Sequence, residues 1–182
     1  MRFKSIAIEN VFSYYGLKHF DFEKKDEPVV LIIGENGFGK TSFINSVKIA
    51  LHGINKDILN IGNQILSKED FVVGNSKKNF SGMLNRKAKL DGTNEAKISV
   101  TLDDDDLYIV ERTFTFKDGS YVESLMLYDE EHALLAQGDD AQDIINQKIS
   151  PTMARFFFFD GEKIQTIADF SHAEFTQMLE DV

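Results

Sequence analysis

The residues best suited to chemistry stand together at positions 34–41, in the run Gly-Glu-Asn-Gly-Phe-Gly-Lys-Thr. This run fits the pattern G-x-x-x-x-G-K-S/T. Small residues allow backbone N–H groups to turn inward around a phosphate, and the helix that follows adds the partial positive charge of its N-terminus. We therefore predict a site for a nucleoside triphosphate, with ligand-binding residues Gly34, Asn36, Gly37, Gly39, Lys40, Thr41 and Ser42.

Two oxygen-bearing residues are candidates for holding the metal that accompanies a triphosphate. The hydroxyl of Thr41 is placed by the motif to bind Mg²⁺, which prefers oxygen ligands. Asp160 follows four phenylalanines that are expected to form a buried strand, and ligands of open α/β sheets gather at such strand ends. Asp160 could also act as a helix N-cap. Lys40 and Asp160 are the candidate catalytic residues, and ATP with Mg²⁺ is the expected cofactor pair.

GTP is the alternative nucleotide. A guanine site usually requires N-K-x-D after a buried strand, and Asn55-Lys56-Asp57 places its aspartate one residue too early with no predicted strand before it. ATP is therefore favoured.

The elements that must position this loop can be predicted from hydrophobic periodicity. Residues 2–9 alternate like an edge strand, with Phe3 on the side opposite Ile6 and Ile8, and 17–23 read as its hairpin partner. The five aliphatic residues 29–33 suit a strand covered on both faces. The helix beginning near Gly39 should bury one stripe and stop at Gly53. The expected stripe consists of Phe43, Val47, Ala50 and Leu51.

The second half of the chain predicts an antiparallel meander, a helix and a buried strand. Segments 96–102, 107–116 and 121–128 have strand character and are joined by acidic or Asp-Gly turns, and Arg112 in the second of them is expected to pair with an acid. A helix is expected over 139–149 and a strand over 154–159. The predicted fold is an α/β P-loop lobe with a mixed sheet, in which the meander forms a side subdomain.

Composition limits the class of protein. The chain has 182 residues, enough for one domain, and a formal net charge of −10. Because it has no cysteine, disulfides and thiolate chemistry are excluded. No signal peptide or membrane-length apolar run is evident, so a cytoplasmic protein is expected. One cationic stretch could follow a DNA backbone or simply be a solvated loop. It contains Lys77, Lys78, Arg86, Lys87 and Lys89.

Three segments together resemble a known group of ATPases. These are IENVFSYYG (8–16), VVLIIGENGFGKTSFINSVKIALHG (29–53) and FFFFDGEKI (156–164). They resemble the N-terminal lobe of SMC-like ATPases of the SbcC and RecF kind, and FFFFDGEKI is most similar to the DndD family, which is associated with bacterial DNA phosphorothioation. The resemblance extends from residue 1 to about 167, and it implies that 168–182 begin a helical, coiled-coil arm.

The resemblance implies how such a lobe would work. In this group a C-terminal lobe adds the signature, the Walker B acids and a switch histidine, none of which is found in this sequence, so a fragment of a longer protein is expected. It implies hydrolysis only with that lobe and on dimerisation of two heads, a nucleoid-associated role on DNA without a membrane, and contacts with other phosphorothioation-system proteins. It also implies that Ser13 and Tyr14 lie near the α-phosphate and adenine, and that Asp160 replaces a glutamine.

The rival function is an ATP-switched scaffold of a repair or phage-defence complex, in which hydrolysis is incidental. Tyr14 itself has two possible roles, because an aromatic residue beside a strand can stack on a base or belong to the core.

Overall fold

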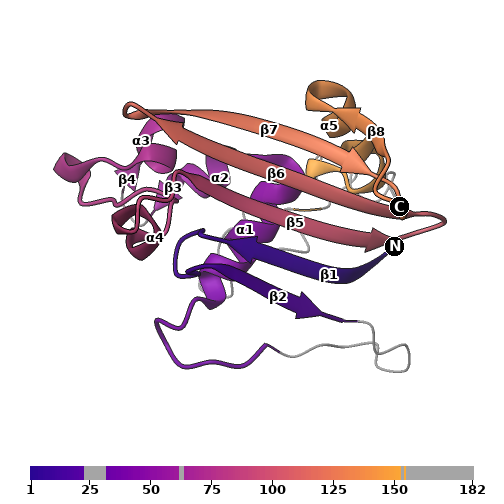
Figure 1. Cartoon of the computed structure of the whole chain (residues 1–182), viewed down its shortest axis with the longest axis horizontal. Helices are drawn as coiled ribbons and strands as arrows, with labels where there is room; N and C mark the ends of the chain where they lie inside the picture. Colours follow the sequence, from indigo (N-terminus) through magenta and orange to yellow (C-terminus); the bar gives the residue numbers. More distant parts are fainter. Residues whose placement is uncertain (23–31, 62–63, 153, 155–182) are drawn as a thin grey trace, which may run out of the picture.

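One antiparallel sheet organises the molecule (Figure 1). The computed structural model describes residues 1–22, 32–61, 64–152 and 154. Six of its strands form a sheet in the order β2-β1-β5-β6-β7-β8, and each neighbouring pair is antiparallel. The strands are β1 (Arg2–Glu9), β2 (Leu17–Asp21), β5 (Glu95–Asp103), β6 (Leu107–Lys117), β7 (Ser120–Tyr128) and β8 (Leu134–Gln137).

Alternation along the strands decides which face is buried. In β5, Ile98, Val100 and Leu102 are buried whereas the intervening residues are less so, as expected for a sheet with one covered face. The predicted strands 2–9, 17–23, 96–102, 107–116 and 121–128 are confirmed within the described residues, with small changes at their ends. The sequence reading missed β8.

A β-bulge in β1 changes the predicted facing of its first residues. The simple alternation sets Phe3 on the side opposite Ile6 and Ile8. The register against β5 shifts between Phe3 and Ser5, so Phe3 pairs with Leu102 and packs against the same core as Ile6 and Ile8. An extra residue in one strand rotates everything before it to the other face, which explains the error.

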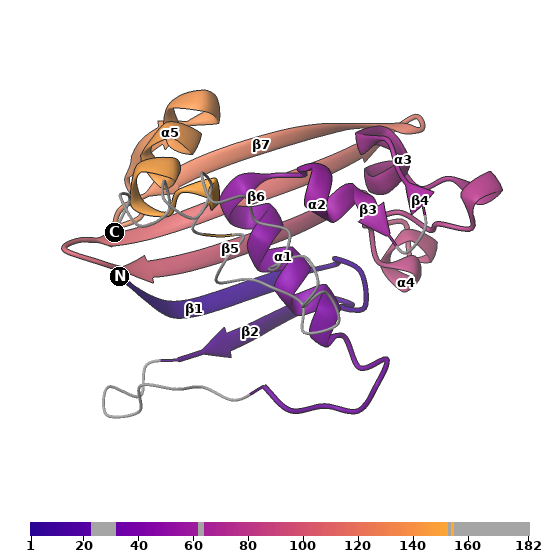
Figure 2. The same ribbon diagram turned by 180° about the vertical axis from the view of Figure 1, so that it is seen from behind.

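Helices cover one face of the sheet, as the view from behind shows (Figure 2). The longest is α1, which packs against β5 and β6, and α5 packs against β7, β8 and α1. Among the described residues no helix lies on the opposite face. The helices are α1 (Lys40–His52), α2 (Lys56–Leu59), α3 (Lys68–Val73), α4 (Arg86–Leu90) and α5 (Gly138–Lys148).

The helix after the glycine-rich loop forms as predicted. Phe43, Val47, Ala50 and Leu51 are all buried, and the helix ends at Gly53. Gly53 has a φ of 65° and its amide donates to Ile49 at 2.8 Å, a C-terminal cap that a side chain would strain. The predicted helix at 139–149 corresponds to α5, whose Ile145 is buried.

Residues 54–92 contain short elements that begin at polar caps. Asn55, Ser67 and Asn85 accept hydrogen bonds from the first amides of α2, α3 and α4. A 3-10 turn, η1 (Ser76–Lys78), begins in the same way after Asn75. The remaining pair is a small hairpin of β3 (Asn60–Ile61) and β4 (Gln64–Ile65).

Two parts of the predicted architecture need correction. The meander is not a side subdomain, because β1 pairs with β5 and makes hairpin and meander one continuous sheet. Of the expected strand 29–33, Ile32 and Ile33 are described; they belong to no strand and are 43% and 83% exposed. A strand buried on both faces needs neighbours, and no described strand pairs with this segment. Residues 29–31 and 155–159, on which a mixed sheet depended, lie outside the described residues.

Candidate functional site

The glycine-rich loop leads directly into the N-terminus of α1. Gly37 and Gly39 have φ values of 87° and 91°, in the left-handed region that glycine adopts without strain. The first hydrogen bond within the helix runs from the Phe43 amide to the Gly39 carbonyl at 2.8 Å. The amides before Phe43 therefore have no partner in the helix. The first turn of α1 has no acidic residue and no side-chain cap, so this helix end fits an anion.

Lys40 directs its charge into the same loop. Its Nζ donates to the carbonyl oxygens of Gly34 and Glu35 at 2.5 and 2.9 Å. The ammonium group is thus held in the curve of the loop, close to the amides that begin α1. This is the position in which a cation can meet the terminal phosphates of a nucleotide.

Thr41 and Ser42 differ in accessibility. Thr41 is exposed, so its hydroxyl is available to a metal that a nucleotide carries. The hydroxyl of Ser42 lies 3.1 Å from that of Ser13. The described residues contain no group of three acidic or histidine side chains that could hold a metal. A single hydroxyl such as that of Thr41 fits the open Mg²⁺ coordination in which phosphate and water complete the shell. Asp160, the other predicted metal residue, lies outside the described residues.

Tyr14 supports the loop from the sheet side. Its hydroxyl donates to the Gly39 carbonyl at 3.0 Å. Its ring packs edge-to-face on Phe20 of β2, which in turn packs edge-to-face on Phe43 of α1. Burial raises the pKa of the Tyr14 phenol, so the group stays a neutral donor at physiological pH. The predicted stacking of Tyr14 on a base stays a prediction.

A buried arginine fixes the other end of α1. Arg112 is 4% exposed, and its Nε donates to the Ala50 carbonyl at 3.2 Å. The same guanidinium forms an ion pair with Glu123 and donates to Gln142 of α5 at 2.7 Å. The expectation that Arg112 pairs with an acid is confirmed. Burial lowers the pKa of this guanidinium, which Glu123 opposes. The contact joins α1 to β6, β7 and α5.

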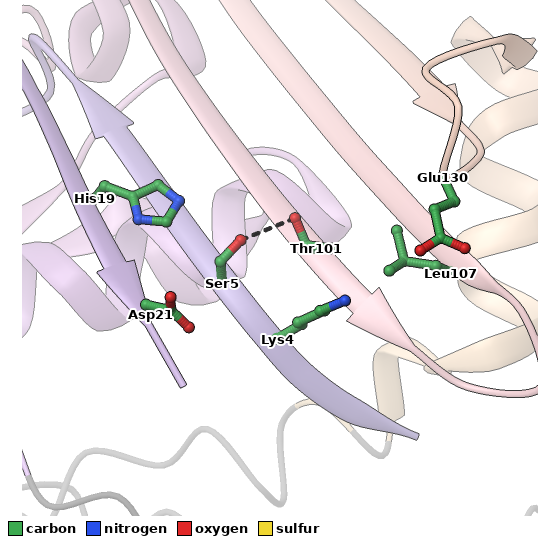
Figure 3. Close-up of a pocket in the computed structure, with 7 residues that line it drawn as sticks. All are labelled: Lys4, Ser5, His19, Asp21, Thr101, Leu107 and Glu130. Atoms are coloured by element: carbon green, nitrogen blue, oxygen red, sulfur yellow. Dashed lines mark hydrogen bonds between the residues drawn. The ribbon is translucent and has the colours of Figure 1, made fainter. Parts of the chain in front are cut away.

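A shallow depression of about 340 Å³ lies on the opposite face of the sheet (Figure 3). Ser5 and Thr101 meet there through a 3.0 Å hydrogen bond, whereas their strand neighbours Ile6 and Val100 point into the core. The other lining side chains include charges of both signs, and no glycine-rich turn borders the depression. It is separate from the loop. The lining residues are Lys4, Ser5, His19, Asp21, Thr101, Leu107 and Glu130.

The cationic residues are divided between two elements. Lys78, in η1, pairs with Asp70 at 2.7 Å. The hydrogen bonds that Lys78 and Asn75 donate to Asp70 lower the pKa of this carboxyl to about 2. In α4, Lys87 lies 4.2 Å from the centre of the Tyr15 ring. Arg86 and Lys89 are exposed on α4 and Lys77 is exposed in η1. Most of the exposed positive charge of this cationic stretch is therefore on α4.

Asn55 has a structural task that argues against a guanine site. Its side-chain oxygen accepts from the amides of Asp57 and Ile58 at 3.1 and 3.3 Å. This N-cap explains why asparagine stands there without any base to recognise.

Comparison with known proteins gives one family. No curated protein matches the chain. Within the described residues no helix is both long enough and apolar enough to cross a membrane. A family model described as an AAA domain matches residues 5–180, which include the whole glycine-rich loop, α1 and all of the sheet except the first residues of β1. The chain belongs to this AAA domain family of P-loop ATPases.

Proposed function

We propose that this chain is the MgATP-binding lobe of an SMC-like ATPase head. One observation carries the proposal: the Lys40 ammonium lies in the turn Gly34–Gly39, which leads into first amides of α1 that have no partner within the helix, and the first helical turn has no acid. Anions bind such a helix end because its N–H groups and its dipole both favour negative charge. A nucleoside triphosphate with its metal is the ligand that also employs the exposed Thr41 hydroxyl.

The described residues account for binding and charge stabilisation. The amides and Lys40 would hold the β and γ phosphates, and Thr41 would orient the metal that the nucleotide brings. Phosphoryl transfer also needs a group that orients the attacking water. The described part of the chain brings no acidic cluster to the loop. We therefore propose that this group comes from a complementary lobe and from a second head facing the first, so that the chain alone turns over ATP very slowly.

The cellular setting follows from the same proposal. The exposed cations of α4 suit the phosphate backbone of DNA, since contacts with lysine and arginine supply most sequence-independent affinity. The segment FFFFDGEKI supports a role of the DndD kind, in DNA phosphorothioation. An ATP-switched scaffold remains the competing outcome, in which Lys40→Ala abolishes turnover but leaves DNA binding intact.

Calorimetric titration of the purified chain with MgATP and MgGTP tests the binding function. We expect MgATP to bind and Lys40→Ala to weaken this binding at least about tenfold, through loss of a charge-assisted contact. Lys117→Ala, which removes an exposed lysine at the C-terminal end of β6, is the matched control and should bind normally. Equal affinity of wild type and Lys40→Ala, or preference for MgGTP, would overturn the proposal.

Pairing of heads has its own test. If two heads complete one site, turnover per molecule of the head assembled from both lobes should rise with protein concentration. A turnover number that stays constant over a hundredfold dilution would show that each head works alone.

A further inference from the structure

We propose that Asn85 is a positioning residue for the nucleotide site, acting through the loop that joins β1 to β2. This inference rests on the proposed function, because it concerns how the same phosphate loop is held in place. Asn85 is only 8% exposed and precedes α4, which is remote in sequence from both the β1–β2 loop and the phosphate loop.

The β1–β2 loop contains a backbone conformation that one of its residues, Phe12, does not favour. Asn10 and Phe12 have φ values of 56° and 49°, in the left-handed region. Asparagine tolerates this region, whereas for a bulky residue such as phenylalanine it is an outlier. Such a conformation persists only where the surrounding structure determines it.

Asn85 supplies two of the contacts that determine it. Its side-chain Nδ2 donates to the Phe12 carbonyl at 2.7 Å, and its backbone amide donates to the Asn10 carbonyl at 2.8 Å. Two residues away, the Met83 carbonyl accepts from the Phe12 amide at 2.7 Å. Both polar backbone groups of Phe12 are therefore bound by the segment that enters α4.

The loop held in this way touches the phosphate loop at two adjacent points. The hydroxyl of Ser13 lies 3.1 Å from that of Ser42, and the hydroxyl of Tyr14 donates to the Gly39 carbonyl at 3.0 Å. Phe12 immediately precedes Ser13, and Tyr14 is the next residue. A change in its backbone conformation must therefore move the two side chains that contact the beginning of α1.

Asparagine is the residue type that this position requires. Its Oδ1 accepts from the amides of Lys87 and Ala88 at 3.0 and 3.2 Å, which caps α4, while its Nδ2 donates to Phe12. Serine caps helices well but has no amide donor to reach that carbonyl. Asn85→Ser therefore keeps the cap and removes the contact with the loop.

The test compares Asn85→Ser with Asn55→Ser. Asn55 caps α2 through its side-chain oxygen in the same way, so the second variant controls for the exchange of one cap for another. We expect Asn85→Ser to raise the dissociation constant for MgATP roughly three- to tenfold, the effect of one buried hydrogen bond. The amide resonance of Gly39 should also shift. Asn55→Ser should change neither quantity.

A double-mutant cycle with Tyr14→Phe separates positioning from a general loss of stability. If Asn85 acts through the β1–β2 loop, the double variant should bind MgATP little worse than the single variant with the lower affinity. The effects of two residues that act in series are not additive. Additive effects, or unchanged MgATP affinity in Asn85→Ser, would overturn the inference. If Asn85→Ser does not fold, Tyr14→Phe alone decides: reduced affinity supports the role of this loop, and unchanged affinity refutes it.

The wild type and Lys40→Ala distinguish this inference from the function on which it rests. A wild type that does not bind MgATP removes the proposed function itself. If the wild type binds MgATP, Lys40→Ala does not, and Asn85→Ser binds as tightly as the wild type, only the inference about Asn85 is refuted.

Discussion

The hydroxyl of Tyr14 lies 3.0 Å from the carbonyl oxygen of Gly39, the residue at which the phosphate loop becomes a helix. The two residues are 25 positions apart in the chain. Because one belongs to the hairpin of the sheet and the other begins α1, the position of the phosphate loop is set partly by the sheet on which it rests. Changes at this contact should therefore alter nucleotide binding by moving the phosphate loop.

Gly39→Ala should be more damaging than Gly37→Ala. Both glycines have left-handed φ values, so alanine is strained at either position. A Cβ at Gly39 would also lie 3.3 Å from the Tyr14 hydroxyl and 3.4 Å from the Ser13 Cβ, whereas a Cβ at Gly37 meets nothing within 4 Å. We expect about 1 kcal/mol of lost stability for Gly37→Ala and a larger loss for Gly39→Ala. Urea denaturation measures both, and equal losses would show that the Tyr14 contact is unimportant.

Arg112→Ala should strongly destabilise the fold. It leaves the Glu123 carboxylate, the Ala50 carbonyl and the Gln142 side chain without their arginine partner. Removing one member of a buried ion pair costs about 3–5 kcal/mol, and the remaining pair of Glu123 with Lys68 favours the lower end.

The matched control for Arg112 is Lys97→Met, which breaks a 2.7 Å ion pair with Glu111 on the open face of the sheet. Such exposed pairs contribute about 0–1 kcal/mol. Both free energies of unfolding come from the same denaturation experiment. Similar losses in the two variants would contradict a special role for the buried arginine.

His52 should make stability depend on pH. Both of its ring nitrogens are shielded from solvent, and within the described structure neither has a hydrogen-bond partner. Burial lowers the pKa of this imidazole; proximity to Asn146 opposes the shift and the charge of Arg112 adds to it. The unfolded chain, with a pKa near 6.5, then binds the proton more readily than the folded chain. The stabilising effect of neutral His52 is therefore complete above that pH and is lost as pH falls.

The free energy of unfolding should fall less steeply in His52→Leu than in the wild type when pH is lowered from about 7.5 to 5.5. His19→Gln, at an exposed position on β2, is the control and should follow the wild type. Parallel profiles for wild type and His52→Leu would contradict this assignment.

If α4 contacts a DNA backbone, charge removal there should lower affinity and its dependence on salt together. Arg86→Gln with Lys89→Gln removes two exposed cations and should reduce the slope of log affinity against log salt concentration by about 1–2. The control pair, Lys18→Gln with Lys117→Gln, removes the same charge elsewhere on the surface. An equal reduction by both pairs would indicate an effect of net charge alone.

Local sequence patterns predicted much of the fold because strands and helix ends depend largely on neighbouring residues. Strict alternation located β5, β6 and β7, and the glycine-rich motif located the start of α1. Capping signals in 54–92 could have been used as well, since Ser67 begins α3 as an N-cap that accepts from the Asp70 amide. The bulge that turns Phe3 inward has no such signal, because it is visible only in the register between two strands.

The sequence predicted the residues of the phosphate-binding motif but not the residues that hold this motif in place. Lys40 and Thr41 follow from spacing, since the motif itself defines their tasks. The hydrogen bond from Asn85 to Phe12 joins residues 73 positions apart, and no local pattern links them. An asparagine before a short helix indicates a cap, but its second contact depends on how the sheet brings two segments together.

Nucleotide binding at the phosphate loop is tested most directly by recording amide resonances of the isotope-labelled chain during titration with MgATP. We expect saturable shifts that are largest at Gly37, Gly39, Lys40 and Thr41, and their absence in Lys40→Ala. Shifts confined to the open face of the sheet, around Lys4, His19 and Thr101, or no shift at any ligand concentration, would contradict binding at this loop.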